Sequence, residues 1–174
     1  MRPTREGIRR HYEAVAEVGI PIVAYNIPSR TATDMPNDLL AELGQIDNVV
    51  ALKQARYEDL AAIDGLDLLA GNDDILAKTM DVGGTGGILV AAQLVGDEMR
   101  RIIDEPDNRH EIEAGLRDLY EALTVTTNPI PIKAAMNLAG HDVGGLRLPL
   151  VEASEEEKAV LRAALERHGL LAAV

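Results

Sequence analysis

The chain has 174 residues, no cysteine, a net charge of −12 and only four aromatic residues, all of them tyrosine. Without cysteine, disulfides, iron–sulfur clusters and thiolate zinc sites are excluded. The acidic balance and scarce aromatic rings disfavour nucleic-acid binding, which needs clustered Lys and Arg and stacking platforms.

At 47% hydrophobic residues, the chain can bury a sizeable core. No apolar run approaches the roughly 20 residues of a membrane helix. The N-terminal residues 1–6 lead into no apolar signal core. We therefore expect a soluble, cytoplasmic protein that binds neither membrane nor nucleic acid.

Short apolar runs alternate with amphipathic stretches in the first half of the chain. Glycine, proline or polar turn residues bound these runs, as is typical of buried strands. Strands are predicted over residues 20–25, 49–52, 66–70 and 87–90. Helices are predicted over residues 5–18, 36–43, 57–63 and 73–82, the first with Thr4 as its N-cap. This alternation predicts a parallel sheet covered by helices.

The strand pattern stops at Gln93, and only helical patterns follow. Helices are predicted over residues 95–103, 109–123, 130–139 and 155–168. The last one has a capping box made by Ser154 and Glu157. The chain is therefore divided into an α/β segment, 1–92, and a helical region, 93–174. Four strands do not close a barrel, and an eight-stranded β/α barrel takes about 250 residues. The first segment is either an open sheet or part of a barrel.

Three side chains near predicted strand ends could carry chemistry. Lys53 ends the run 49–52, where parallel α/β folds bind ligands, and its amine could attack a carbonyl; the alternative is a lysine whose stem only covers apolar surface. Tyr25 ends the preceding run and could relay protons, or could be a rim residue. Arg30 follows in the next loop and could bind a carboxylate in bidentate fashion, or lie on the surface.

Other motifs favour structural roles. The glycine cluster 83–87 precedes a strand, whereas a dinucleotide-binding loop follows one. Asp73 and Asp74 suit the start of a helix better than a metal pair. Lys133 lies in a helix-start pattern with nearby prolines, and the four histidines are dispersed. No metal site is predicted.

Taken together, these residues resemble the pyruvate-dependent class I aldolase family of dihydrodipicolinate synthase and N-acetylneuraminate lyase. Tyr25-Asn26-Ile27-Pro28-Ser29-Arg30-Thr31 is followed by Lys53, 28 positions after the tyrosine. Further motifs match in order and spacing over nearly the whole chain: Ala70-Gly71-Asn72-Asp73-Asp74, Gly83-Gly84-Thr85-Gly86-Gly87-Ile88, Asn128-Pro129-Ile130-Pro131-Ile132-Lys133 and Leu146-Arg147-Leu148-Pro149-Leu150.

The resemblance implies a TIM (β/α)8 barrel of which this chain supplies the fifth to eighth strands and the C-terminal helices. It implies a lyase of lysine and diaminopimelate biosynthesis that condenses pyruvate with aspartate semialdehyde. Lys53 would form the Schiff base with pyruvate, Tyr25 would relay protons, and Arg30 would bind the semialdehyde carboxylate. Gly71 and Ile88 would line the pyruvate pocket through backbone groups. No metal or organic cofactor is implied, and full-length relatives are commonly homo-oligomers.

The sequence also departs from the family pattern. Ala51-Leu52-Lys53-Gln54-Ala55 stands where Gly-Ile-Lys-Glu-Ala is usual, and Ala32 stands where glycine is frequent. The family's first four β/α units, with a Gly-Thr-Thr loop that binds pyruvate, are missing. We expect little synthase activity from the chain alone, and either aggregation or pairing with a second half, because a half barrel has open strand edges. Another pyruvate-dependent aldolase, or a non-catalytic remnant or partner subunit, are the alternatives.

Overall fold

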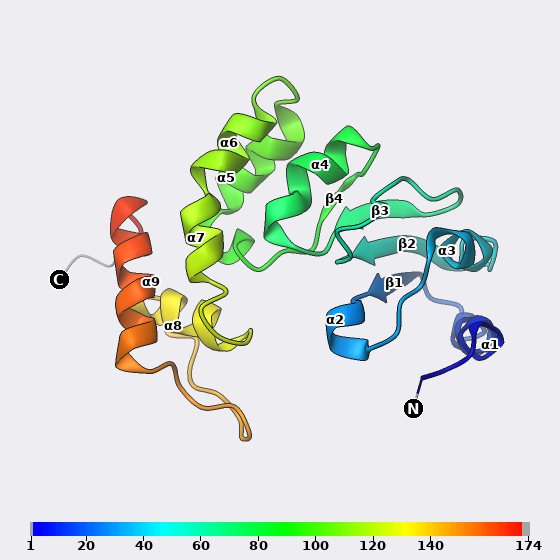
Figure 1. Ribbon diagram of the computed structural model, residues 1–174, viewed down its shortest axis with the longest axis horizontal. Helices are drawn as coiled ribbons and strands as arrows, with labels where there is room; N and C mark the ends of the chain where they lie inside the picture. The colour runs from blue at the N-terminus through cyan, green and yellow to red at the C-terminus, as the bar shows by residue number, and fades with distance from the viewer. Residues whose placement is uncertain (1, 172–174) are drawn as a thin grey trace. The chain divides into compact units, whose positions relative to one another are not determined.

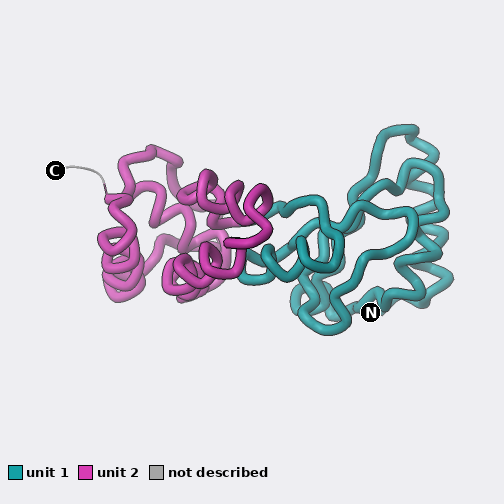
Figure 2. The backbone as a smooth tube through the Cα atoms, turned by 90° about the horizontal axis from the view of Figure 1, so that it is seen from above, with its two compact units in different colours: residues 1–89 teal, residues 90–174 magenta. Residues whose placement is uncertain are grey.

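The computed structural model describes residues 2–171. The chain forms two compact units, residues 1–89 and residues 90–174, coloured separately in Figure 2. The first unit contains the sheet, and the second is helical. Their roles as the second half of a barrel and as a C-terminal helical region remain predictions.

The first unit is built on a parallel sheet whose strands lie in sequence order, as Figure 1 shows. The strands are β1 (Ile22–Asn26), β2 (Val49–Gln54), β3 (Asp67–Ala70) and β4 (Gly86–Gly87). Tyr25 lies opposite Lys53 in the register, and Lys53 lies opposite Leu69. The predicted parallel sheet is confirmed, and its order places the carboxyl ends of consecutive strands side by side.

Helix α1 (Arg5–Ala16) precedes the first strand. The helices between strands are α2 (Pro28–Thr31), α3 (Asn37–Leu43), the 3-10 helix η1 (Asp73–Ile75) and α4 (Leu76–Asp81). Helix α1 begins as predicted at Thr4, whose hydroxyl accepts a hydrogen bond from the Gly7 N–H at 3.1 Å. Arg5 ties α1 to α3, with 2.7 Å ion pairs to both Asp38 and Glu42.

The hydrophobic core of the first unit lies on one face of the sheet. Ala24, Leu52 and Leu68 point to this face and are almost fully buried, together with Leu40 and Leu43 of α3. Ile8 and Tyr12 of α1 pack against the same cluster. Because side chains alternate along a strand, the residues between these positions point to the opposite face.

Two predicted elements of the first unit are wrong. Residues 57–63 form turns rather than a helix, because Asp59 adopts a left-handed backbone with φ of 51°. Leu60 and Ile63 are instead buried from an irregular loop. The predicted strand 87–90 shortens to Gly86–Gly87. The Ile88 N–H donates to the Ala70 carbonyl at 3.0 Å, and β3 ends at Ala70, so the later residues have no strand partner.

The described part of the second unit is helical, as predicted. It contains α5 (Ala92–Asp104), α6 (Arg109–Gly115), α7 (Arg117–Ala122), α8 (Ile130–Leu138) and α9 (Glu155–Arg167). The single helix predicted over 109–123 is divided at Leu116, which forms the boundary between α6 and α7. The capping box of Ser154 and Glu157 is present at α9. Within residues 2–171, no helix is long and apolar enough to cross a membrane.

Asp118 links α7 to the end of α9. Its carboxylate accepts hydrogen bonds from Arg167 at 2.6 Å and contacts His168 Nε2 at 2.8 Å. These two partners lower the pKa of Asp118 to about 2. The carboxylate therefore stays charged in neutral solution and holds the C-terminal end of α9 against α7.

Candidate functional site

Lys53 and Tyr25 lie next to each other on adjacent strands. Their Cα positions are register partners of β2 and β1, and both side chains point to the face opposite the core. The Lys53 Nζ atom lies over the Tyr25 ring, 4.2 Å from its centroid. The sequence prediction that an amine and a phenol meet at this end of the sheet agrees with the geometry.

This face of the sheet is open in the first unit taken by itself. Tyr25 is 39% exposed, and Val23, which points to the same face of β1, is 44% exposed. An amine beside a half-exposed aromatic ring is accessible to a small carbonyl compound. The arrangement therefore suits nucleophilic attack by Lys53.

Arg30 is exposed and lies in α2, immediately after β1. Sequence reasoning missed this short helix, although Pro28 at its first turn is a known helix-start signal. The helix ends at Ala32, whose φ of 52° is left-handed. Glycine adopts this conformation without steric cost, which explains why glycine suits the position in related sequences.

Gly71 and Ile88 follow the third and fourth strands, at the same end of the sheet. The Gly71 N–H donates to the Gln54 carbonyl at 2.7 Å, and the Ile88 N–H donates to the Ala70 carbonyl at 3.0 Å. A Cβ atom on residue 71 would lie 2.7 Å from the Gln54 carbonyl oxygen, so only glycine fits there. Since both N–H groups are engaged within the sheet, backbone contacts from these residues to a ligand would come from their carbonyl oxygens.

A second phenol lies among these loops and was missed from the sequence. The Tyr57 hydroxyl donates to Asp74 Oδ1 at 3.1 Å. Partial burial, together with the charge of Asp74, raises the pKa of Tyr57 to about 12. Asp73 and Asp74 lie in the first turn of η1, after Asn72 at the N-cap position. Among residues 2–171, His, Asp and Glu side chains form no group of three that could hold a metal ion, and we propose no metal ligands.

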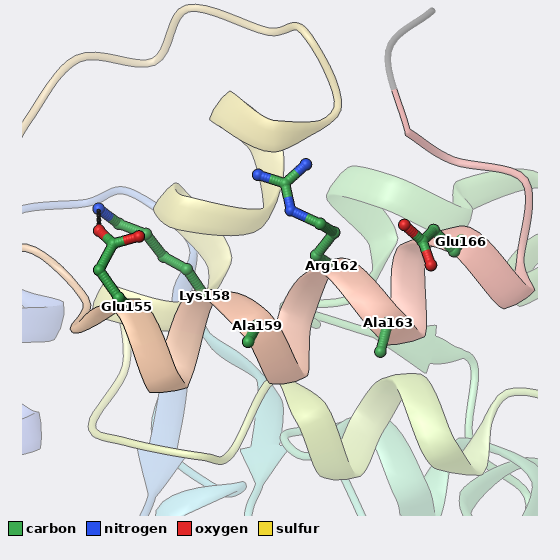
Figure 3. A pocket seen from close by; sticks show the side chains of 6 residues that line it. All are labelled: Glu155, Lys158, Ala159, Arg162, Ala163 and Glu166. Atoms are coloured by element: carbon green, nitrogen blue, oxygen red, sulfur yellow. Dashed lines mark hydrogen bonds and ion pairs between the residues drawn. The ribbon is translucent and has the colours of Figure 1, made fainter.

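A separate hollow of about 250 Å³ lies on α9 (Figure 3). All of its lining residues belong to this helix: Glu155, Lys158, Ala159, Arg162, Ala163 and Glu166. Two alanines leave the depression between longer charged side chains, and Lys158 pairs with Glu155 at 2.8 Å. None of the predicted site residues lines this hollow.

Comparison with known proteins identifies relatives along the whole described chain. The Dihydrodipicolinate synthetase family matches residues 1–168. The 4-hydroxy-tetrahydrodipicolinate synthase of Clostridium novyi is 41% identical over 180 residues, which cover 96% of this chain and 61% of that protein. The enzyme of the same name from Heliobacterium modesticaldum is 38% identical, covering 97% of this chain and 61% of the relative.

Solved structures give the same result. The dihydrodipicolinate synthase of Thermotoga maritima superposes with a TM-score of 0.91 at 36% identity, covering 98% of this chain and 63% of that one. The expected TIM barrel family fold is thereby confirmed, and the coverage is consistent with a partial barrel. The chain spans about three fifths of the length of the curated relatives that it matches.

Proposed function

The chain belongs to the dihydrodipicolinate synthetase family, and from this premise we propose that it performs the chemistry of a 4-hydroxy-tetrahydrodipicolinate synthase. The substrates are pyruvate and aspartate semialdehyde, and the product enters lysine and diaminopimelate biosynthesis in the cytoplasm. One observation carries the proposal above the others. The Lys53 amine lies over the Tyr25 ring on the open face of a parallel sheet, at its carboxyl end.

The proposed reaction begins when the neutral Lys53 amine attacks the ketone carbon of pyruvate. The resulting carbinolamine loses water to form an imine. A methyl proton then leaves, and the C–H electron pair forms an enamine with the protonated imine as the electron sink. The enamine carbon attacks the aldehyde of aspartate semialdehyde, whose oxygen takes up a proton. The amino group of the bound product then adds to the re-formed iminium carbon and displaces the Lys53 amine, which releases the cyclic product. Tyr25 would relay these protons, and no cofactor is required.

The other predicted residues bind substrate in this scheme. Arg30 would hold the carboxylate of the semialdehyde through its guanidinium fork. Gly71 and Ile88 would line the pyruvate pocket. A Gly-Thr-Thr sequence, which the family resemblance associates with binding of the pyruvate carboxylate, does not occur in these 174 residues. We therefore expect imine formation at Lys53 but slow overall condensation by these residues, and homo-oligomerisation as the family resemblance implies.

Gln54 stands where the family usually has glutamate, and its side chain does not face Lys53. Gln54 is 2% exposed and lies on the opposite side of β2 from Lys53. Its side-chain oxygen accepts a hydrogen bond from the Arg56 N–H at 3.2 Å. The residue therefore supports the loop after β2.

Borohydride trapping with pyruvate tests the proposal. The full chain is incubated with pyruvate, reduced, digested and analysed by mass spectrometry. We expect a stable adduct on Lys53 that is lost in Lys53→Arg and retained in Lys133→Arg, because the Lys133 amine instead donates to the Val143 carbonyl at 2.8 Å.

Other outcomes of the trapping experiment would support one of the alternative functions. No adduct on a folded chain would contradict the proposal and leave a non-catalytic remnant or partner subunit. An adduct that reacts with other aldehydes, and not with aspartate semialdehyde, would indicate a different pyruvate-dependent aldolase.

A further inference from the structure

A largely buried arginine lies three residues beyond Lys53. The Arg56 side chain is 11% exposed, and its Nη1 atom pairs with Asp34 Oδ2 at 3.0 Å. Its Nη2 atom donates to Asn37 Oδ1 at 2.8 Å. A cation removed from water in this way must be paired, since an unpaired buried charge is strongly destabilising. The guanidinium therefore fixes the positions of the residues that it contacts.

Asp34 connects Arg56 to Asn26 at the end of β1. Its Oδ1 atom accepts a hydrogen bond from Asn26 Nδ2 at 3.1 Å. Asn26 is 1% exposed and also binds the backbone of Met35 twice, donating to its carbonyl at 3.1 Å and accepting from its N–H at 3.2 Å. These bonds join residue 26 to residues 34 and 35, closing the segment between them into a loop.

The closed segment, residues 27–33, is the one that carries Arg30. Its near end is fixed to β1 and its far end is fixed through Asp34 to the loop that follows β2. The Ala55 N–H adds a bond from that second loop to the Asn26 carbonyl at 2.9 Å. Arg56 thus connects the strand that carries Lys53 with the loop that carries Arg30. Small displacements of groups that bind two reacting molecules cost large factors in rate.

We propose that Arg56 is a positioning residue that acts through Asp34 and Asn26 to hold Arg30 at the correct place relative to Lys53. Its effect is on the second, carboxylate-bearing aldehyde substrate and not on pyruvate. This inference rests on the proposed function for its substrate, while the bracing of the loop rests on the contacts alone. None of the three bracing residues needs to touch either substrate.

The test uses the full chain with Arg56→Met, which removes the charge, and Arg56→Lys, which keeps it. Asp34→Asn breaks the same ion pair without removing the arginine. Arg100→Met is the matched control, because Arg100 pairs only locally with Asp104 at 2.7 Å in α5. Amide hydrogen exchange is followed over residues 27–35, and pyruvate trapping at Lys53 is followed with increasing aspartate semialdehyde.

We expect faster amide exchange over residues 27–35 in Arg56→Met and Asp34→Asn, and an unchanged exchange rate in Arg100→Met. In both variants, the amount of pyruvate trapped without semialdehyde should be unchanged. The concentration of aspartate semialdehyde that halves the amount of trapped pyruvate imine should rise about tenfold or more. Arg56→Lys should recover part of this loss, which a purely structural role does not predict.

Two results would overturn the inference: unchanged exchange in Arg56→Met, or faster exchange with an unaltered semialdehyde dependence. If the unmodified chain traps no pyruvate, the proposed function fails first. The exchange data then decide separately whether Arg56 braces the loop, with unchanged exchange rejecting that role.

Discussion

The two faces of the sheet in the first unit differ in composition and exposure. On one face, Ala24, Leu52 and Leu68 are at most 1% exposed and pack under α1 and α3. On the other, Lys53 lies over the ring of Tyr25, which is 39% exposed, and Val23 is 44% exposed. Neighbouring residues of the same strands thus have different roles. Residues on one face contribute to the free energy of folding, and residues on the other present an amine and a phenol.

This difference implies that stability and chemistry can be changed separately. A side chain on the core face loses burial when it is shortened, because its contacts are with other core atoms. A side chain on the open face loses a reactive group and little burial. A substitution on one face that produced the effect expected of the other would contradict this separation.

The largest expected effect is on the open face. Lys53→Met should abolish the borohydride-trapped pyruvate adduct, because the proposed reaction forms the imine on the Lys53 amine. The free energy of unfolding should change by less than about 1 kcal/mol, the scale of the contact between the Lys53 cation and the Tyr25 ring. Mass spectrometry and urea unfolding measure the two quantities. Global unfolding of Lys53→Met would show that the open face also carries stability.

The next effect is on the core face. Leu52→Ala should lower the free energy of unfolding by about 3 kcal/mol, because Leu52 is fully buried and the cavity cannot collapse completely. Val23→Ala is the control on the open face and should cost less than about 1 kcal/mol. Urea unfolding followed by circular dichroism provides the comparison. Equal losses in the two variants would contradict the division between the faces.

Gly71 holds the loop after β3 close to β2, so its substitution should affect both stability and pyruvate binding. Gly71→Ala should cost roughly 1–3 kcal/mol, since the new Cβ would lie 2.7 Å from the Gln54 carbonyl oxygen. It should also reduce pyruvate trapping if this loop lines the pocket. Gly96→Ala in α5 meets no atom within 4 Å, so it should instead stabilise the chain by up to about 1 kcal/mol. Thermal unfolding distinguishes these opposite signs.

The smallest expected effect concerns the ion pairs of Arg5, which join α1 to α3. Arg5 lowers the pKa of Asp38, so their pairing stabilises the folded chain above about pH 4 and is lost as pH falls through the lowered pKa. Arg5→Gln should therefore slightly lower the urea midpoint at neutral pH, and the difference should vanish in strong acid. Arg10→Gln is the control, because Arg10 pairs with Glu6 within α1. A difference that grows on acidification would reverse the expected sign.

Much of the fold could be predicted from local patterns. The apolar runs, the Thr4 cap and the capping box at Ser154 act over a few residues, so their signals are visible in the chain itself. The helix predicted over 57–63 is wrong because Leu60 and Ile63 are buried by tertiary packing from an irregular backbone. The small helix α2 is too short to produce a periodic signal.

Patterns along the chain were enough to identify the class of the fold, the family resemblance and the positions of Lys53 and Tyr25 at the ends of apolar runs. The folded chain was needed to show that these two side chains share a face, with the amine 4.2 Å from the ring centroid, and that Arg56 pairs with Asp34. The reason is the range of the interactions. Strand and cap patterns depend on near neighbours, whereas strand register and a buried ion pair depend on residues that folding brings together from about 20 or more positions apart.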